Sequence, residues 1–317
     1  MSNAARSMSS EARPIVVVGS INVDLVAKMS RIPALGETML ASEFNTFAGG
    51  KGANQAVAVA RLGYPVRMIG RVGSDVFGER MVRDLKAAGV DTSAVGVAEG
   101  STGVAMIAVA AGGENSIIVA PGANSLVTPE FLEDHADYIR NAGMVLAQLE
   151  IPLASILHLA SLCEAAEVPL MLDPAPACAL PDELFPQLAW ITPNETEARA
   201  LVSTEGLSAP EIAKCLLGKG ARGVILKLGA RGCLISRPGE DDVRIGGYRV
   251  DAVDTTAAGD SFNGAFATGL MLGKSIEESG VFASAAAAVS VTRSGAQLSM
   301  PTLGEVREML RASARFE

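Results

Sequence analysis

Short, wholly apolar runs that alternate with helix-period segments most restrict how this chain can fold. The runs occupy residues 15–18, 66–69, 144–148, 169–172, 190–192 and 224–228. Between them, apolar residues recur at helical spacing in residues 54–62, 77–88, 129–142, 153–166, 195–202 and 209–217. A strand that is apolar throughout is buried on both faces, as in a parallel sheet covered by helices. The sequence therefore predicts an α/β fold with a mostly parallel central sheet and helices on both faces. Further helices are expected at residues 257–272, 276–292 and 303–314.

Two stretches break this alternation. Residues 103–121 read as strand, turn and strand around Gly-Gly-Glu-Asn at 112–115, which is a hairpin signal. Residues 23–46 carry short alternating pieces broken by Pro33 and Gly36. We interpret both as an antiparallel β-sheet lid, with strands from about 22–48 and 102–122, inserted into one domain at residues 13–317. Residues 1–12 lack the apolar core of a signal peptide and are expected to be a disordered tail that includes a cloning remnant.

Composition excludes several classes of protein. A chain that is 49% hydrophobic and 19% charged is too apolar to stay disordered, and its longest apolar runs are too short to span a membrane. A net charge of −9 disfavours nucleic acid or an anionic membrane surface as a partner. The four cysteines form no CxxC pair, so we expect free buried thiols in a reducing cytoplasm. The two histidines, His135 and His158, are interpreted as packing or surface residues.

The segment from Asp251 to Phe266 carries the strongest indication of chemistry. The small residues Ala257, Ala258 and Gly259 open a helix and leave its first amides uncovered, which makes a site for an anion. Asp260 follows in the first turn, where it could act as a general base while the amides hold developing charge. Alternatively, Asp260 only complements the helix dipole and Gly259 only eases packing.

A second glycine-rich segment, Gly-Gly-Lys-Gly-Ala-Asn at residues 49–54, precedes another predicted helix. Its glycines would let the backbone approach a ligand, while Lys51 and Asn54 offer hydrogen-bond donors to hydroxyl groups. Glycine-rich turns before helices are also common without any ligand.

Polar side chains also stand at the predicted ends of strands. Asn22 and Asp24 follow the first strand, and Glu150 ends an otherwise apolar one. Such groups suit sugar hydroxyls, although turn formation or helix capping would explain them equally well. Asn194 and Glu197 have the spacing of a capping box, and the alternative is a role in organising magnesium-bound water near phosphates.

Familiar nucleotide signatures are missing. The stretch that ends in Gly273-Lys274-Ser275 has Thr268 where a Walker A motif needs its first glycine. No GxGxxG follows Val18, so a nicotinamide dehydrogenase has no fingerprint here.

With these segments assembled, the chain resembles the PfkB family of carbohydrate kinases, and most closely its ribose-phosphorylating branch. The family's first signature is matched by residues 49–54 and its second by Asp-Thr-Thr-Ala-Ala-Gly-Asp at residues 254–260. Six further motifs match in order, at residues 22–24, 148–150, 174–177, 192–197, 228–232 and 293–297. The resemblance runs from about Ile15 to Ala314, nearly the whole chain.

The resemblance implies transfer of the ATP γ-phosphate to the 5-hydroxyl of D-ribose, giving D-ribose 5-phosphate. By position, Asp260 would be the general base, and the amides of Ala257, Ala258 and Gly259 would form the anion hole. The residues implied to bind the sugar beneath the lid are Asn22, Asp24, Gly50, Lys51, Gly52, Asn54, Glu150 and Asp260.

The same resemblance implies sites for ATP and two cations. The matching ATP positions are Asn194, Lys227, Gly229, Arg231, Gly232, Gly259 and Ser284, where Lys227 departs from the small hydroxyl residue of the family. Asn194 and Glu197 would organise Mg²⁺ through water. An activating K⁺ would be held, largely by backbone carbonyls, at Asp254, Thr256, Ser290, Arg293, Gly295 and Ser299.

Other functions remain open at this point. The sugar could instead be 2-deoxyribose, fructose, a ketodeoxy acid or a nucleoside, although the lid offers mainly Phe44 and Phe47 for stacking on a base. A non-catalytic sugar-binding protein of the same fold is a further alternative. Apolar alternation in the lid suits a homodimer formed through it.

Overall fold

The body of the molecule is built on a large sheet. In the residues that this computed structural model describes, 12–202 and 206–313, nine strands form the sheet. Neighbours are parallel from β5 to β11, and β12 and β13 add an antiparallel edge. The order is β13 (Val243–Ile245), β12 (Cys233–Ser236), β11 (Val224–Lys227), β10 (Trp190–Ile191), β9 (Leu170–Asp173), β8 (Met144–Gln148), β1 (Ile15–Val18), β4 (Val66–Gly73) and β5 (Asp91–Ala98).

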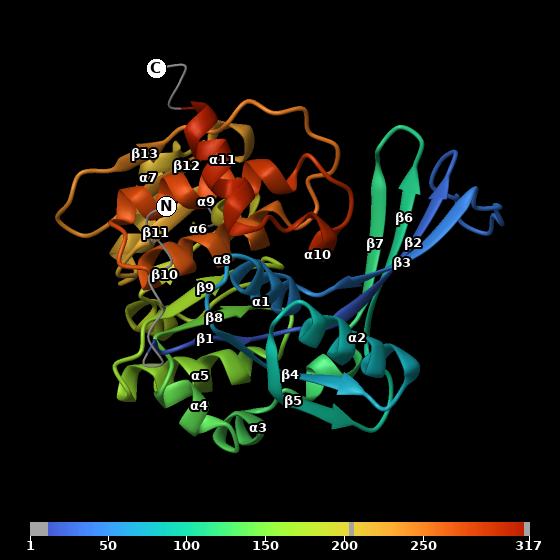
Figure 1. Cartoon of the computed structure of the whole chain (residues 1–317), viewed down its shortest axis with the longest axis horizontal. Coiled ribbons are helices and arrows are strands. Elements are labelled where there is room, and N and C mark those ends of the chain that lie inside the picture. The colour runs from blue at the N-terminus through green and yellow to red at the C-terminus, as the bar shows by residue number, and fades with distance from the viewer. Residues whose placement is uncertain (1–11, 203–205, 314–317) are drawn as a thin grey trace, which may run out of the picture.

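Helices cover both faces of this sheet (Figure 1). Alternate side chains of β1 enter two separate cores, Ile15 and Val17 on one face and Val16 and Val18 on the other. The first core is closed by α1 (Lys51–Arg61), α2 (Val76–Ala87), α8 (Ala258–Met271), α9 (Ile276–Ser290) and α11 (Leu303–Ser313). The second is closed by α3 (Pro129–Glu133), α4 (Ala136–Arg140), α5 (Leu153–Ala165), α6 (Glu195–Val202) and α7 (Ala209–Gly218). The predicted fold class is confirmed.

Short helical turns complete the described chain: η1 (Gly122–Leu126), η2 (Asp182–Gln187), η3 (Gly229–Arg231) and α10 (Ala296–Ser299). None of the helices within the described ranges combines the length and apolar character that crossing a bilayer requires.

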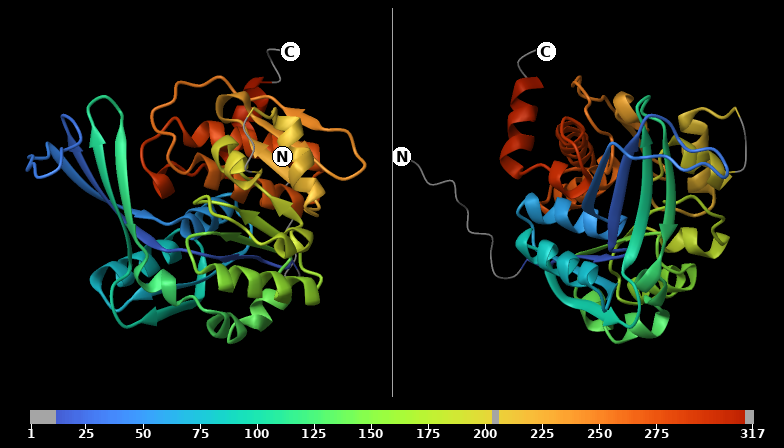
Figure 2. Two further views of the ribbon diagram at one scale, coloured as in Figure 1. Left: turned by 180° about the vertical axis from the view of Figure 1, so that it is seen from behind. Right: turned by 90° about the vertical axis from the view of Figure 1, so that its right-hand side faces the viewer.

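The lid is a second sheet that stands away from the body (Figures 1 and 2). Its order is β3 (Glu43–Gly49), β2 (Asn22–Met29), β6 (Gly103–Ala110) and β7 (Asn115–Ala120). The expectation of antiparallel pairing throughout is wrong, because β2 and β6 pair in parallel. Both strands leave the body in the same direction, with Asn22 opposite Gly103, so two antiparallel hairpins join along a parallel seam.

Other differences have local causes. The helix expected at 129–142 is two helices, because the backbone leaves helical geometry at His135, whose Nδ1 lies 2.8 Å from the carbonyl oxygen of Phe131. The expectation of buried thiols holds for Cys163 and Cys233 and is wrong for Cys178 and Cys215, which are exposed. The expected tail falls outside the described residues except for Ala12.

Candidate active site

Three segments meet at the carboxyl edge of the sheet: the residues that follow β1, the residues that follow β8, and the start of α1. Ser20, which follows β1, donates a hydrogen bond from Oγ to Oε2 of Glu150, which follows β8, at 2.5 Å. The amide of Lys51, the first residue of α1, donates to the same oxygen at 3.1 Å. Ligands of open α/β sheets bind at such a divergence of loops. The structure therefore places Glu150 at the position where a ligand is expected.

The glycine-rich loop allows the backbone of α1 to approach the start of the lid. Gly50 has φ 87° and ψ 127°, a conformation that glycine adopts readily and other residues do not. A Cβ on Gly50 would lie 2.6 Å from the amide nitrogen of Asn22. Gly49 is equally crowded, because a Cβ there would lie 2.3 Å from Oδ2 of Asp24. The amide of Gly52 donates a hydrogen bond to Oγ of Ser20 at 3.4 Å.

The start of α8 has an unusual backbone. Ala257, at its N-cap, has φ 58° and ψ 15°, in the left-handed region that residues with a Cβ rarely adopt. Strain of this kind gathers at functional sites, and alternating left- and right-handed residues turn successive amides toward one point. This conformation fits the predicted anion hole at Ala257, Ala258 and Gly259.

Asp260 is buried next to those amides, with 4% of its surface exposed. Its Oδ2 accepts a hydrogen bond from Nδ2 of Asn54 at 3.0 Å, and its Oδ1 accepts one from Nε2 of Gln55 at 3.1 Å. Burial raises the pKa of the Asp260 carboxyl to about 6, with Lys51 and the two amide donors opposing the rise and Asp173 adding to it. A fixed carboxylate with such a pKa can accept a proton near neutral pH.

A second carboxylate comes from the lid. Burial, with the nearby charges of Glu150 and Asp260, raises the pKa of Asp24 to about 6. Asn22 is held in place from η1, because Nδ2 of the buried Asn124 donates to its Oδ1 at 2.7 Å.

Lys51 balances this negative charge. Burial lowers the pKa of its ammonium group, but the charges of Asp260, Asp173, Glu150 and Glu197 together raise it above the ordinary value. The ammonium therefore stays charged among these four carboxylates.

Some residues of this site escaped sequence reasoning. Gln148 donates from Nε2 to Oε1 of Gln55 at 2.8 Å, and Gln55 in turn donates to both Asp260 and Asp173 at 3.1 Å. Ser20 and Asp173 are likewise buried at strand ends. The available signal was a polar residue at the end of an apolar strand or within two residues after it, which applies to Ser20, Gln148 and Asp173.

A cavity of about 260 Å³ lies beside the anion hole. Its walls include Lys227, Gly229, Gly232, Gly259 and Ser284, five of the residues expected to bind ATP. Arg231 is not among the wall residues, and its guanidinium pairs with Glu195 at 2.7 Å on the surface.

Asn194 and Glu197 form the capping box that was one of the two interpretations. The backbone amide and Nδ2 of Asn194 both donate to Glu197 at 2.8 Å, and the amide of Glu197 donates back to Oδ1 of Asn194. This capping role still leaves the pair near the site. The backbone of Asn194 forms an isolated parallel β-bridge with Lys227, and the charge of Glu197 raises the pKa of Lys51.

Asp254 ties the segment before the anion hole to the loop after α9. Its Oδ1 accepts from the amide of Thr256 and its Oδ2 from the amide of Gly295, both at 2.9 Å. Burial raises its pKa, but these hydrogen bonds outweigh burial and keep it below the ordinary value. Arg293 points away, to Glu305 of α11 at 2.5 Å, while the hydroxyls of Ser290 and Ser299 donate to carbonyls one turn back in the chain.

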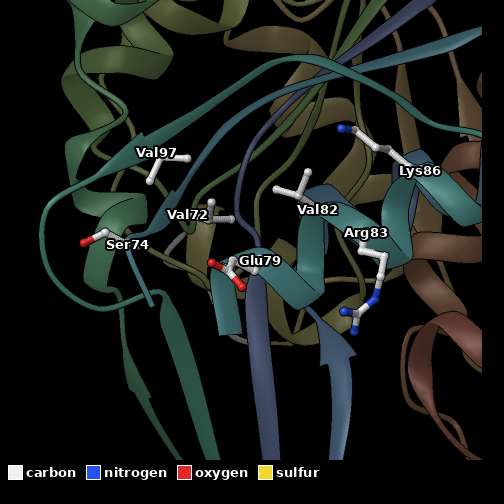
Figure 3. A pocket seen from close by; sticks show the side chains of 9 residues that line it. Val72, Ser74, Glu79, Val82, Arg83, Lys86 and Val97 are labelled. Carbon is white, nitrogen blue, oxygen red and sulfur yellow. The ribbon is translucent and has the colours of Figure 1, made fainter. Parts of the chain in front are cut away.

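A larger groove of about 600 Å³ lies elsewhere, between α2 and the ends of β4 and β5 (Figure 3). Val72, Val82 and Val97 form its apolar wall, and Glu79, Arg83 and Lys86 add charged groups. It contains none of the predicted site residues, so the smaller cavity is the one connected to the anion hole.

Comparison with known proteins decides the family. The model of the pfkB family carbohydrate kinases matches residues 12–303. The chain belongs to the PfkB family of carbohydrate kinases. It is 42% identical over 302 residues to a ribokinase of Haemophilus influenzae, covering 94% of this chain and 98% of that protein. It is also 35% identical over 302 residues to a deoxyribokinase of Salmonella typhi, covering 93% of this chain and 98% of that protein.

A solved structure is also similar in sequence and in fold. Ribokinase of Arabidopsis thaliana, complexed with ribose and ATP, superposes with a TM-score of 0.89 at 38% identity, covering 95% of this chain and 99% of that one. The expected resemblance to the PfkB family is thus confirmed over nearly the whole chain.

Proposed function

We propose that the chain phosphorylates D-ribose at the 5-hydroxyl, with ATP as the phosphoryl donor. The observation that carries the proposal is the buried Asp260, held by Asn54 and Gln55 at the start of α8, next to the segment Ala257–Gly259. The similarity to ribokinases at about 40% identity over nearly the full length supports ribose as the sugar.

In the proposed step, Asp260 accepts the proton of the sugar hydroxyl as its oxygen attacks the γ-phosphorus of ATP. The bond between that phosphorus and the bridging oxygen breaks, and ADP leaves with the electron pair. Charge spreads over the transferring oxygens, where the amides of Ala257, Ala258 and Gly259 stabilise it. Asp260 remains the base throughout because its two amide donors fix its orientation.

The sugar would lie between the lid and α1. Carboxylates accept hydrogen bonds from sugar hydroxyls, and we propose that Asp24 of the lid strand β2 and Glu150, which follows β8 of the body, supply them. We propose that Asn22, Lys51 and Asn54 donate to the remaining hydroxyl oxygens, and that the amides of Gly50 and Gly52 line the loop. Residues 13–317 would work as one domain that closes its lid over the sugar.

ATP would enter the cavity next to Gly259, with magnesium. When bound with ATP, Mg²⁺ neutralises charge on the phosphate oxygens. The described residues contain no cluster of three or more carboxylate, histidine or cysteine ligands. We propose that phosphate oxygens would hold the cation and that Asn194 and Glu197 would contact it through water.

Potassium is proposed as an activator in the loop around Asp254. The proposal rests on position, since Asp254 accepts hydrogen bonds from the amides of Thr256 and Gly295 and so joins the two stretches of chain whose backbone carbonyls would hold the ion. The ion would stiffen the segment that carries the anion hole.

Two further proposals concern the whole molecule. Ile117, Ile118 and Val119 of β7 are 48–62% exposed on the lid, which favours a homodimer formed through this sheet. A cytoplasmic location is proposed for an enzyme that uses ATP and carries free thiols.

The direct test is ADP release by purified protein with ATP and D-ribose, in potassium and in sodium. We expect turnover with ribose that is faster in potassium. Activity on 2-deoxyribose or fructose but not on ribose would show that the proposed substrate is wrong and that the proposed kinase activity is right. The similarity to a deoxyribokinase makes this comparison necessary. No turnover with any of these sugars would favour a non-catalytic sugar-binding protein.

Acid should inactivate the enzyme through two carboxylates. Both Asp24 and Asp260 have a pKa of about 6, and both act only when ionised, so kcat/KM for ribose should fall as the pH drops below 6. Because two groups take up protons, the loss should exceed tenfold per pH unit, approaching about a hundredfold. Asp24→Asn should reduce the steepness to about tenfold per unit. An unchanged kcat/KM between pH 7 and pH 5 would contradict both assignments.

A further inference from the structure

Lys227 ends β11 with its side chain directed into the site. Its Nζ lies 2.9 Å from Oδ1 of Asp173, which ends β9, and the two side chains are only 13% and 3% exposed. The anchoring carboxylate is itself fixed, since Oδ2 of Asp173 accepts from Nε2 of Gln55 at 3.1 Å. The ammonium group therefore has a defined position.

That position is at the boundary between the anion hole and the nucleotide cavity. A Cβ built on Gly259 would lie 3.2 Å from Nζ of Lys227, so the ammonium is adjacent to the backbone of the hole. Lys227 and Gly259 also line the same cavity, together with Gly229 and Ser284.

The ammonium has hydrogen-bonding capacity left. A lysine ammonium carries three donors, and among the described residues Asp173 is the only hydrogen-bond acceptor within reach of Nζ. The remaining donors can therefore serve an anion that enters the cavity.

The charge distribution also calls for a cation here. Asp24, Glu150, Asp173 and Asp260 surround the site, and Lys51 lies among the same carboxylates. A triphosphate that reached the anion hole would bring further negative charge next to Asp173. Lys227 is placed to offset the repulsion between the two.

We propose that Lys227 is a catalytic residue, whose ammonium donates to an oxygen of the transferring phosphoryl group, and that Asp173 is its positioning residue. The proposal rests on the proposed kinase function. During transfer, the phosphorus–oxygen bond to ADP breaks and the bond to the sugar oxygen forms, and the lysine remains protonated. It gives and takes no proton and acts only on the charge of the oxygens.

The first test is Lys227→Met, which keeps most of the length of the side chain and removes its charge. We expect kcat to fall about 10²–10³-fold, as for loss of one oxyanion donor. ATP affinity without sugar should fall about 10- to 100-fold, as for loss of a hydrogen bond to a charged group, while ADP affinity stays unchanged because ADP lacks the γ-phosphate. The matched control is Lys219→Met, which breaks a Lys–Asp pair on the surface at 2.7 Å and should change neither quantity.

A double variant separates catalysis from simple neutralisation of Asp173. Removing one partner of a buried ion pair leaves an uncompensated charge, whereas Asp173→Asn with Lys227→Met leaves none. If Lys227 acts on the phosphoryl group, the double variant stays as slow as Lys227→Met. Recovery of turnover in the double variant, or unchanged ATP affinity in the single variant, would overturn the proposal.

The same experiment keeps the two proposals distinguishable. Absence of ribose turnover in the unsubstituted protein would count against the proposed substrate. The ratio of ATP affinity to ADP affinity would still test whether Lys227 contacts the γ-phosphate. Thermal unfolding of each variant identifies any that fails to fold, and the neutral double variant then supplies the ATP and ADP affinities.

Discussion

Asp260→Asn should lower kcat for ribose about 10²- to 10⁴-fold, the contribution of a general base. The substitution keeps the size of the side chain and removes its ability to accept a proton. The introduced amide can still be accommodated, because the buried Oδ1 of Asn54 has no partner among the described residues and can accept from it after rotation of the Asn54 amide. Binding of ADP should change little, since Asp260 acts on the sugar hydroxyl.

The measurement is steady-state ADP release together with calorimetric ADP binding. A matched control is Asp137→Asn, because Asp137 also lies in the first turn of a helix, α4, with a side chain that is 92% exposed. Turnover should be unaffected there. If Asp260→Asn kept normal turnover and only lowered the unfolding temperature, Asp260 would merely stabilise the start of α8.

The buried part of the sheet could be predicted from the sequence because a strand that is buried on both faces has an apolar residue at nearly every position. Every strand expected from its apolar run is present, from β1 to β11. Two of the three strands that were missed, β5 and β13, are the edges of the sheet, where burial is incomplete, whereas β12 was missed although it is fully buried. β5 is an edge strand with Asp91, Ser93 and Gly96, and β13 has only three residues.

Within the site, motifs pointed to the residues that we propose to act, and missed those that hold them in place. Asp260 and the glycine-rich loop belong to compact segments whose spacing carries information. Gln55 joins Asp260 across 205 positions and Asp173 across 118, and no local pattern encodes such a contact. Ser20 reaches Glu150 across 130 positions in the same way. These contacts follow from strand order, which brings β1, β8 and β9 side by side.

Gly50→Ala should damage both stability and catalysis. At φ 87° and ψ 127° an alanine is strained by about 1–3 kcal/mol, and its Cβ would meet the amide of Asn22 at 2.6 Å and the carbonyl oxygen of Ser20 at 2.9 Å. Both obstacles are backbone atoms, so α1 must move away from the start of the lid at a further cost of about 1–3 kcal/mol. Lys51 and Asn54 would move with it, and a displacement near 1 Å can cost about 10²-fold in kcat/KM.

The matched control lies at the other end of the same helix. Gly63 also has a positive φ, 80°, but nothing lies within 4 Å of a Cβ built there. Gly63→Ala should therefore lower the free energy of unfolding by about 1–2 kcal/mol through strain alone and leave kcat/KM for ribose unchanged. Equal kcat/KM for the two variants would show that close approach at Gly50 does not matter. A loss confined to Gly50→Ala would show that the contact between α1 and the residues after β1 sets the geometry of the sugar site.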